Sequence, residues 1–100
     1  MGSSLSSSDQ ALSLRVGEVL HYLWDPVGIA GLPAARDEYD AWVPEIVSLL
    51  KAGADAAQVA GCLSAIVTGR LALAEDHDLA LHVAEILLDW RQALAQPAAP

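Results

Sequence analysis

Residues 78–95 read DLALHVAEILLDWRQALA, and this stretch decides the fold. Its apolar residues recur at helical spacing, which predicts a helix that starts near Asp76 or Asp78 and ends near Ala95. One face carries Leu79, Val83, Ile86, Leu87, Trp90 and Leu94, and another carries Leu81, Ala84 and Leu88. A helix that is apolar on two sides packs against several neighbours, so we expect it at the centre of a bundle.

Three further helices are predicted by the same spacing: residues 9–24, a segment from Arg36 or Asp37 to Ala52, and residues 55–69. Ser8 and Asp55 are the expected N-caps of the first and third of these helices. Pro44 is unfavourable inside a helix, which leaves two alternatives. Either the regular helix starts near Val43 after a separate turn, or the helix bends at the proline.

A loop with two glycines and two prolines follows Trp24, and it separates the first two helices. Prolines fix the backbone and glycines permit tight turns, so we expect this loop to be structured. The predicted fold is therefore all-α, a compact bundle of four helices with a structured Pro/Gly loop between helices 1 and 2. We expect a single helical domain over 9–95, a disordered or expression-derived N-terminus over 1–8 and a frayed tail over 96–100.

The composition excludes several classes of protein. Apolar residues make up 54% of the 100 positions, which rules out disorder for the body of the chain. Thirteen acidic residues against five basic ones give a net charge of −8, which disfavours nucleic acid as a partner. No apolar run is long enough to span a membrane, and no signal peptide is evident. The single cysteine, Cys62, cannot form a disulfide within the chain, and we expect a cytoplasmic protein with a buried, unreactive thiol.

Acidic and aromatic residues concentrate between Trp24 and Glu45. Three interpretations remain open for them: a solvated helix start, an acidic surface that binds a basic protein, or a divalent-cation site. Asp25 precedes Pro26, where we expect it to accept hydrogen bonds from backbone N–H groups of the loop, and it could also pair with His21 four residues earlier. The candidate partner-binding residues are Trp24, Asp25, Asp37, Glu38, Tyr39, Asp40 and Trp42.

Catalytic and metal-binding motifs are missing from the sequence. His21, His77 and His82 do not follow a zinc-ligand spacing, and Ser48 and Ser64 have no nucleophile motif around them. We therefore expect no enzymatic activity, no cofactor and no metal.

Two short motifs resemble those of a small bacterial all-helical family of unknown function. The first is Leu23-Trp24-Asp25-Pro26-Val27-Gly28-Ile29, and the second is Asp37-Glu38-Tyr39-Asp40. The resemblance covers residues 15–92 and implies a compact helical cytoplasmic domain without an assigned activity. We expect the two motifs to pack together at one end of the bundle, with Asp25 accepting backbone donors at the start of the second helix.

The leading functional hypothesis is a non-catalytic domain that binds a basic protein, with an immunity or antitoxin protein as one concrete form. One alternative is a small metal- or ligand-binding domain that uses Asp25, Asp37 and Asp40. The other is a homodimeric structural module, and the sequence leaves both monomer and homodimer open.

Overall fold

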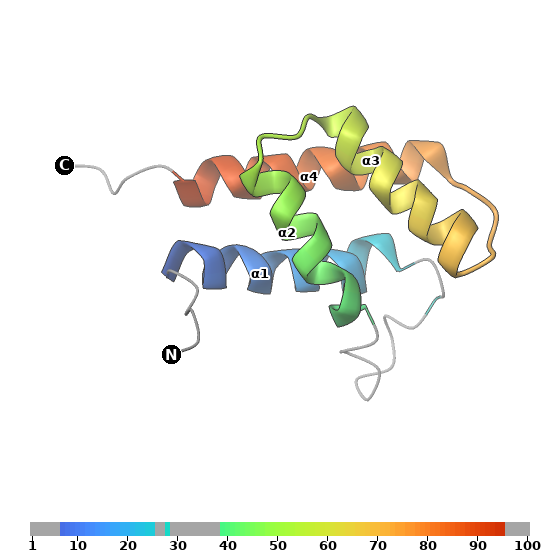
Figure 1. The fold of residues 1–100 in the computed structure, drawn as a ribbon, viewed down its shortest axis with the longest axis horizontal. Helices are drawn as coiled ribbons and strands as arrows, with labels where there is room; N and C mark the ends of the chain where they lie inside the picture. Colours follow the sequence, from blue (N-terminus) through green and yellow to red (C-terminus); the bar gives the residue numbers. More distant parts are fainter. Residues whose placement is uncertain (1–6, 26–27, 29–38, 96–100) are drawn as a thin grey trace.

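The computed structural model describes residues 7–25, 28 and 39–95, and within these ranges the chain forms four α-helices and no strand (Figure 1). The helices are α1 (Ser7–Val19), α2 (Val43–Lys51), α3 (Ala56–Ala65) and α4 (His77–Ala95). Three short helical turns adjoin them: η1 (Leu20–Trp24), η3 (Asp40–Trp42) and η4 (Ile66–Arg70). The prediction of a compact all-α bundle is confirmed. Most of the predicted Pro/Gly loop and the tail 96–100 lie outside the described residues.

Helix α4 is the central helix, as its two apolar faces predict. It contacts α1, α2 and α3, and α1 and α4 run alongside each other while α2 and α3 cross in front of them (Figure 1). Its fully buried positions are Ala80, Val83, Ala84 and Leu87. Two of these four residues are alanines, whose small side chains allow neighbouring helices to approach closely.

The starts of α3 and α4 follow from their capping aspartates. The Asp55 carboxylate accepts a 2.8 Å hydrogen bond from the Gln58 N–H, and the Gln58 side chain accepts one from the Asp55 N–H, which completes a capping box. The Asp76 carboxylate accepts a 3.1 Å hydrogen bond from the Leu79 N–H at the start of α4. Asp55 is therefore confirmed as a cap, and Asp76 rather than Asp78 caps the last helix.

Pro44 selects the first of the two alternatives for the second helix. Helix α2 begins at Val43, so Pro44 lies in its first turn, where its missing N–H has no helical partner to lose. The separate 3₁₀ turn η3 precedes the helix over Asp40–Trp42. Positions 36–38 of the predicted segment lie outside the described residues.

The first helix departs from its predicted start and from regular geometry at its end. Helix α1 begins at Ser7, so Ser8 is inside the helix and is not its N-cap. Its last turn, η1, is π-helical: the Asp25 N–H donates to the Leu20 carbonyl, five residues back, over 2.9 Å. Helix α3 ends in the same way, with the Leu71 N–H donating to the Ile66 carbonyl over 3.0 Å. Both predicted helices therefore reach their expected lengths, but each ends in a widened turn.

Arg91 of α4 fixes the link between α2 and α3, at the end of the bundle opposite the π-helical turns η1 and η4. Its guanidinium donates to the carbonyls of Leu50 and Ala54 over 3.1 and 2.9 Å. Between these carbonyls the chain turns at Gly53, whose φ of 87° suits a residue without a side chain. Of the described helices, none is both long enough and apolar enough to cross a membrane.

Candidate functional site

Asp25 organises the end of the bundle where the two sequence motifs meet. Its Oδ1 accepts a 3.1 Å hydrogen bond from the Gly28 N–H and a 2.9 Å hydrogen bond from the Tyr39 hydroxyl. The first contact is the expected one to loop backbone. The second joins the two motifs through a side-chain donor, so Asp25 and Tyr39 meet as predicted. The backbone donors expected at the start of the predicted second helix, positions 36–38, lie outside the described residues.

Three of the candidate residues, Trp24, Tyr39 and Trp42, are aromatic, and their rings form a cluster. The ring centroids of Trp24 and Tyr39 lie 5.6 Å apart, and those of Trp24 and Trp42 lie 6.3 Å apart, both in edge-to-face geometry. Trp24 is only 3% exposed and Tyr39 only 2% exposed. The prediction that these two side chains edge a binding surface is therefore wrong, because both rings are buried in the hydrophobic core.

Trp42, the third aromatic candidate, is half-buried. The other candidate residues are acidic. Asp40 is exposed on η3, whereas Asp37 and Glu38 lie outside the described residues. No group of three or more His, Cys, Asp or Glu side chains within the described part of the chain could hold a metal ion. Asp40 thus remains available to a partner at the surface, while the half-buried Asp25 is engaged in holding the loop.

His21 does not pair with Asp25, although the two residues are four apart. The His21 side chain is 1% exposed, and neither ring nitrogen has a hydrogen-bond partner among the described residues. The reason is the π-helical turn: Asp25 leaves the helix with φ of 36°, and its carboxylate meets Gly28 and Tyr39 instead. The possible pairing assumed that the first helix, predicted over 9–24, extends regularly to Asp25, for which an i, i+4 contact is normal.

A partly enclosed cavity of about 200 Å³ lies beside Asp25, where η1 and η4 end and α4 begins. Its walls include Trp24, Asp25, Ser64, Val67, Asp76 and Leu79. The Ser64 hydroxyl is buried and has no hydrogen-bond partner among the described residues. Sequence reasoning missed this cavity because its walls come from three helices that are far apart in the chain, and no local motif marks them.

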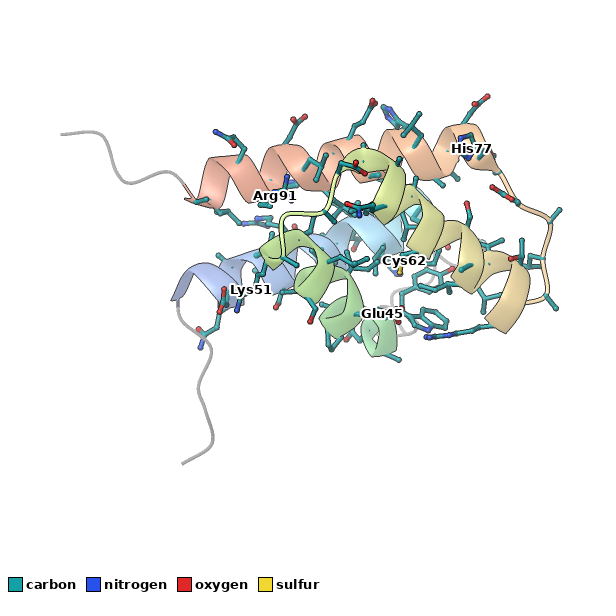
Figure 2. All side chains as sticks on the ribbon, turned by 45° about the horizontal axis from the view of Figure 1, so that its top comes forward. Glu45, Lys51, Cys62, His77 and Arg91 are labelled. Atoms are coloured by element: carbon teal, nitrogen blue, oxygen red, sulfur yellow. The ribbon has the colours of Figure 1, made fainter. Side chains whose placement is uncertain are left out.

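A second cluster lies between α2 and α3, around Cys62. The Cys62 thiol donates a 3.4 Å hydrogen bond to Oε2 of Glu45, and both residues are labelled in Figure 2. Arg70 Nη1 lies 3.3 Å from Glu45 Oε1. Burial, then the hydrogen bond to Glu45 and the charge of Glu45, together raise the pKa of the Cys62 thiol to about 11, against a smaller opposing effect of the Arg70 charge. Cys62 is half-buried rather than buried, but at neutral pH it is held as an unreactive thiol, as the sequence analysis expected.

No family model, curated protein or solved structure matches this chain. What the chain binds must therefore be inferred from the chemistry of its own residues.

That chemistry is rich in hydrogen-bond acceptors and negative charge. Within the described residues, the cavity beside Asp25 is lined by two carboxylates and a hydroxyl and by no basic side chain. The Cys62–Glu45 pair has the opposite character to an activated nucleophile, because a neighbouring carboxylate disfavours the thiolate.

Proposed function

We propose that this chain is a non-catalytic, cytoplasmic protein-binding domain whose acidic surface recognises a basic protein. An immunity or antitoxin protein that neutralises a basic nuclease is the concrete form of this function. A nuclease presents a surface made for phosphate, and carboxylates can take the place of phosphate oxygens there.

The observation that supports this proposal is the pairing of the basic side chains. Each of the four basic residues in the described part of the chain already has a partner. Arg15 pairs with Glu18, Lys51 with Asp9 and Arg70 with Glu45, while Arg91 binds two backbone carbonyls. Among the described residues, no unpaired basic side chain is therefore left for the other exposed carboxylates.

Several of these carboxylates lie in one row along the outside of α4. Asp78, Glu85 and Asp89 are all exposed, and their spacing of seven and four residues places them on one face of the helix, with the exposed His82 between them. Oxygen-tipped side chains project away from the bundle along this helix (Figure 2). We call Asp78, Glu85 and Asp89 the α4 acidic row. Glu75 and Asp76, also exposed, extend negative charge beyond its N-terminal end.

A surface of this kind would speed association with a basic partner, because opposite charges steer diffusional encounter. The same physics makes the interaction sensitive to salt, because the Debye length falls to about 8 Å at physiological ionic strength. Salt sensitivity is therefore the property by which the proposal can be tested.

The test is affinity capture from native lysate at low salt, followed by binding measurements on any basic protein that is identified. The bait is compared with a variant in which the α4 acidic row is neutralised (Asp78→Asn, Glu85→Gln, Asp89→Asn). A second variant carries Asp37→Lys and Asp40→Lys. We expect the partner's affinity to fall with added salt and to fall at least about tenfold in one of the variants, which corresponds to about 1.4 kcal/mol.

Glu18→Gln is the matched control, because it removes one acidic charge that is already paired with Arg15. Its affinity should stay within about twofold of the unmodified chain. The proposal would be rejected if no basic protein binds at low salt, or if both variants bind a captured partner as well as the unmodified chain does. If the partner is a nuclease toxin, co-expression of this chain should also restore growth of cells that produce it.

A further inference from the structure

An open groove of about 630 Å³ separates α2 from α3 on the surface of the bundle. The apolar part of its lining comes from both helices and from η4: Leu49, Ala65 and Ile66. Among the described residues, Glu45 and Arg70 are the charged ones that line it. The groove thus combines an apolar lining with one charge of each sign, a pattern that suits a protein surface better than a small polar ligand.

The two charges make this face different from the rest of the chain. Arg70 Nη1 lies 3.3 Å from Glu45 Oε1, and the two side chains are 55% and 42% exposed. Glu45 lies on α2 and faces Cys62 of α3 (Figure 2). The groove therefore carries no net charge, whereas the whole chain carries −8. Two copies of the chain repel each other through their acidic surfaces, and this neutral face is where they can approach with the least repulsion.

The same pair of charges is self-complementary. In a two-fold symmetric dimer each copy uses the same patch, so a residue i that contacts residue j of the other copy is repaid by the reverse contact. A patch with one carboxylate and one guanidinium meets this condition. Glu45 of each copy can pair with Arg70 of the other, and the two existing ion pairs are exchanged rather than lost.

The outer side of α3 has a shape that fits the groove. Ala57, Gly61 and Ala65 are exposed and lie four residues apart, so they form one ridge of small side chains along the helix. The groove lies directly beside this ridge, where Gln58 and Cys62 line it. Ridges of residues spaced by four pack into the grooves of a neighbouring helix surface. A two-fold axis near α3 would seat the ridge of each copy in the groove of the other.

Gly61 is not explained by packing within this chain. It lies inside α3 at an exposed position, where glycine is less favourable than alanine. A Cβ atom at this position would meet no atom within 4 Å. Glycine in a helix permits another backbone to approach closely, and here the space beside it is open to a second molecule.

We propose that the groove between α2 and α3 is the face through which two copies of this chain associate. The α3 ridge of each copy lies in the groove of the other, and Glu45 and Arg70 exchange partners across the two-fold axis. The inference does not rest on the proposed binding of a basic protein. The α4 acidic row contributes no residue to the groove, so the dimer leaves both rows open to a partner.

The first experiment is sedimentation equilibrium of the unmodified chain from about 5 μM to about 1 mM, where we expect a reversible monomer–dimer equilibrium with a Kd on the order of 100 μM. Added salt should strengthen the association, because it screens the repulsion between two chains that each carry a net charge of −8. Binding of a basic protein should respond to salt in the opposite direction. The two interactions are thereby distinguished, and either proposal can fail without the other.

Gly61→Gln tests the approach of the two α3 helices. The added side chain has room in the monomer but lies between the helices of the dimer, so association should weaken at least about tenfold. Helical circular dichroism and thermal unfolding at low concentration should show a fold at least as stable as that of the unmodified chain, because glutamine favours a helix more than glycine does. Ala93→Gln, at an exposed position of α4, is the matched control and should leave the Kd unchanged.

A charge exchange tests the pairing across the axis. Glu45→Arg and Arg70→Glu each place two like charges on the groove, so each variant alone should associate at least about tenfold more weakly than the unmodified chain. An equal mixture of the two variants should recover association to within about threefold, because each arginine then faces a glutamate of the other copy. The substitutions move the net charge of −8 by two units, to −6 and −10, so general attraction between the variants cannot produce this recovery.

Three results would overturn the proposal. The first is an unmodified chain that stays monomeric at about 1 mM, which is far above the expected Kd. The second is a loss of association in Ala93→Gln as large as that in Gly61→Gln. The third is a mixture of Glu45→Arg and Arg70→Glu that associates no better than either variant alone.

Discussion

The Tyr39 hydroxyl donates a 2.9 Å hydrogen bond to Oδ1 of Asp25, which lies 14 residues earlier in the chain. This contact joins the end of the first helix to the start of the second across the loop between them. The same carboxylate oxygen accepts from the Gly28 N–H, so one atom fixes both the loop and the helix start. Because Asp25 also lines the cavity, the contact couples the local fold to the candidate site.

Removal of the Tyr39 hydroxyl should destabilise the fold. Tyr39→Phe keeps the ring in the core and deletes the hydroxyl that donates to Asp25. A hydrogen bond to a charged group contributes about 1.5–3 kcal/mol, so we expect the free energy of unfolding to fall by about 2 kcal/mol. Urea denaturation followed by circular dichroism measures this change.

Tyr22→Phe is the matched control, because Tyr22 is 57% exposed. We expect its effect to stay within about 0.5 kcal/mol. Equal stabilities for Tyr39→Phe and the unmodified chain would mean that the bond to Asp25 does not hold the two motifs together.

The helices could be predicted because their determinants are local. Asp55 and Gln58 form a capping box that is readable from their spacing. Pro44 lies in the first turn of α2 because proline has no backbone N–H to donate to a preceding turn. The central place of α4 followed from the two apolar faces of one segment.

The site was less predictable because burial and helix geometry depend on distant residues. Trp24 and Tyr39 were candidates for partner binding because they lie among acidic residues in the sequence, but their rings pack into the core from two separate elements. The π-helical turn at η1 was not predicted either, and it redirected Asp25 away from His21. The cavity needs α3 and α4 to meet η1, which no local pattern encodes.

His21 is a buried polar side chain whose replacement should stabilise the protein. Neither of its ring nitrogens has a hydrogen-bond partner among the described residues, and a buried polar group without a partner costs about 1–3 kcal/mol. We expect His21→Leu to raise the free energy of unfolding by about 1 kcal/mol, measured by urea denaturation at pH 8. His82→Leu, at an exposed position of α4, should be close to neutral. A loss of stability in His21→Leu would contradict the assignment of His21 as an unsatisfied group.

Arg91 should matter far more to stability than the other basic residues. Its guanidinium satisfies the carbonyls of Leu50 and Ala54, which close the link between α2 and α3. Arg91→Met leaves both acceptors without this donor, and we expect a loss of about 2 kcal/mol in chemical denaturation. Lys51→Met breaks only an ion pair with Asp9 in which the lysine is 52% exposed, and it should cost less than about 1 kcal/mol. Similar losses in the two variants would show that Arg91 acts only through its charge.

The raised pKa of Cys62 predicts slow alkylation. Burial is the largest cause of the shift from 9.0 to about 11, followed by the hydrogen bond to Glu45 and then by its charge. At pH 9 a thiol with a pKa of 9 is half ionised, whereas one with a pKa near 11 is about 1% ionised. The native chain should therefore react with iodoacetamide about 50-fold more slowly than the chain unfolded in guanidinium.

The same shift has a consequence for stability at high pH. Because the folded state holds the proton more tightly than the unfolded state, the stabilisation from Cys62 is complete below pH 9 and is lost as the pH rises towards 11. Glu45→Gln removes the charge of the carboxylate and leaves the burial, so it should lower the pKa and speed alkylation at pH 9, whereas Glu85→Gln on α4 should not. If Glu45→Gln reacts no faster than the native chain, burial alone holds the proton on Cys62, and Glu45 contributes only its ion pair with Arg70.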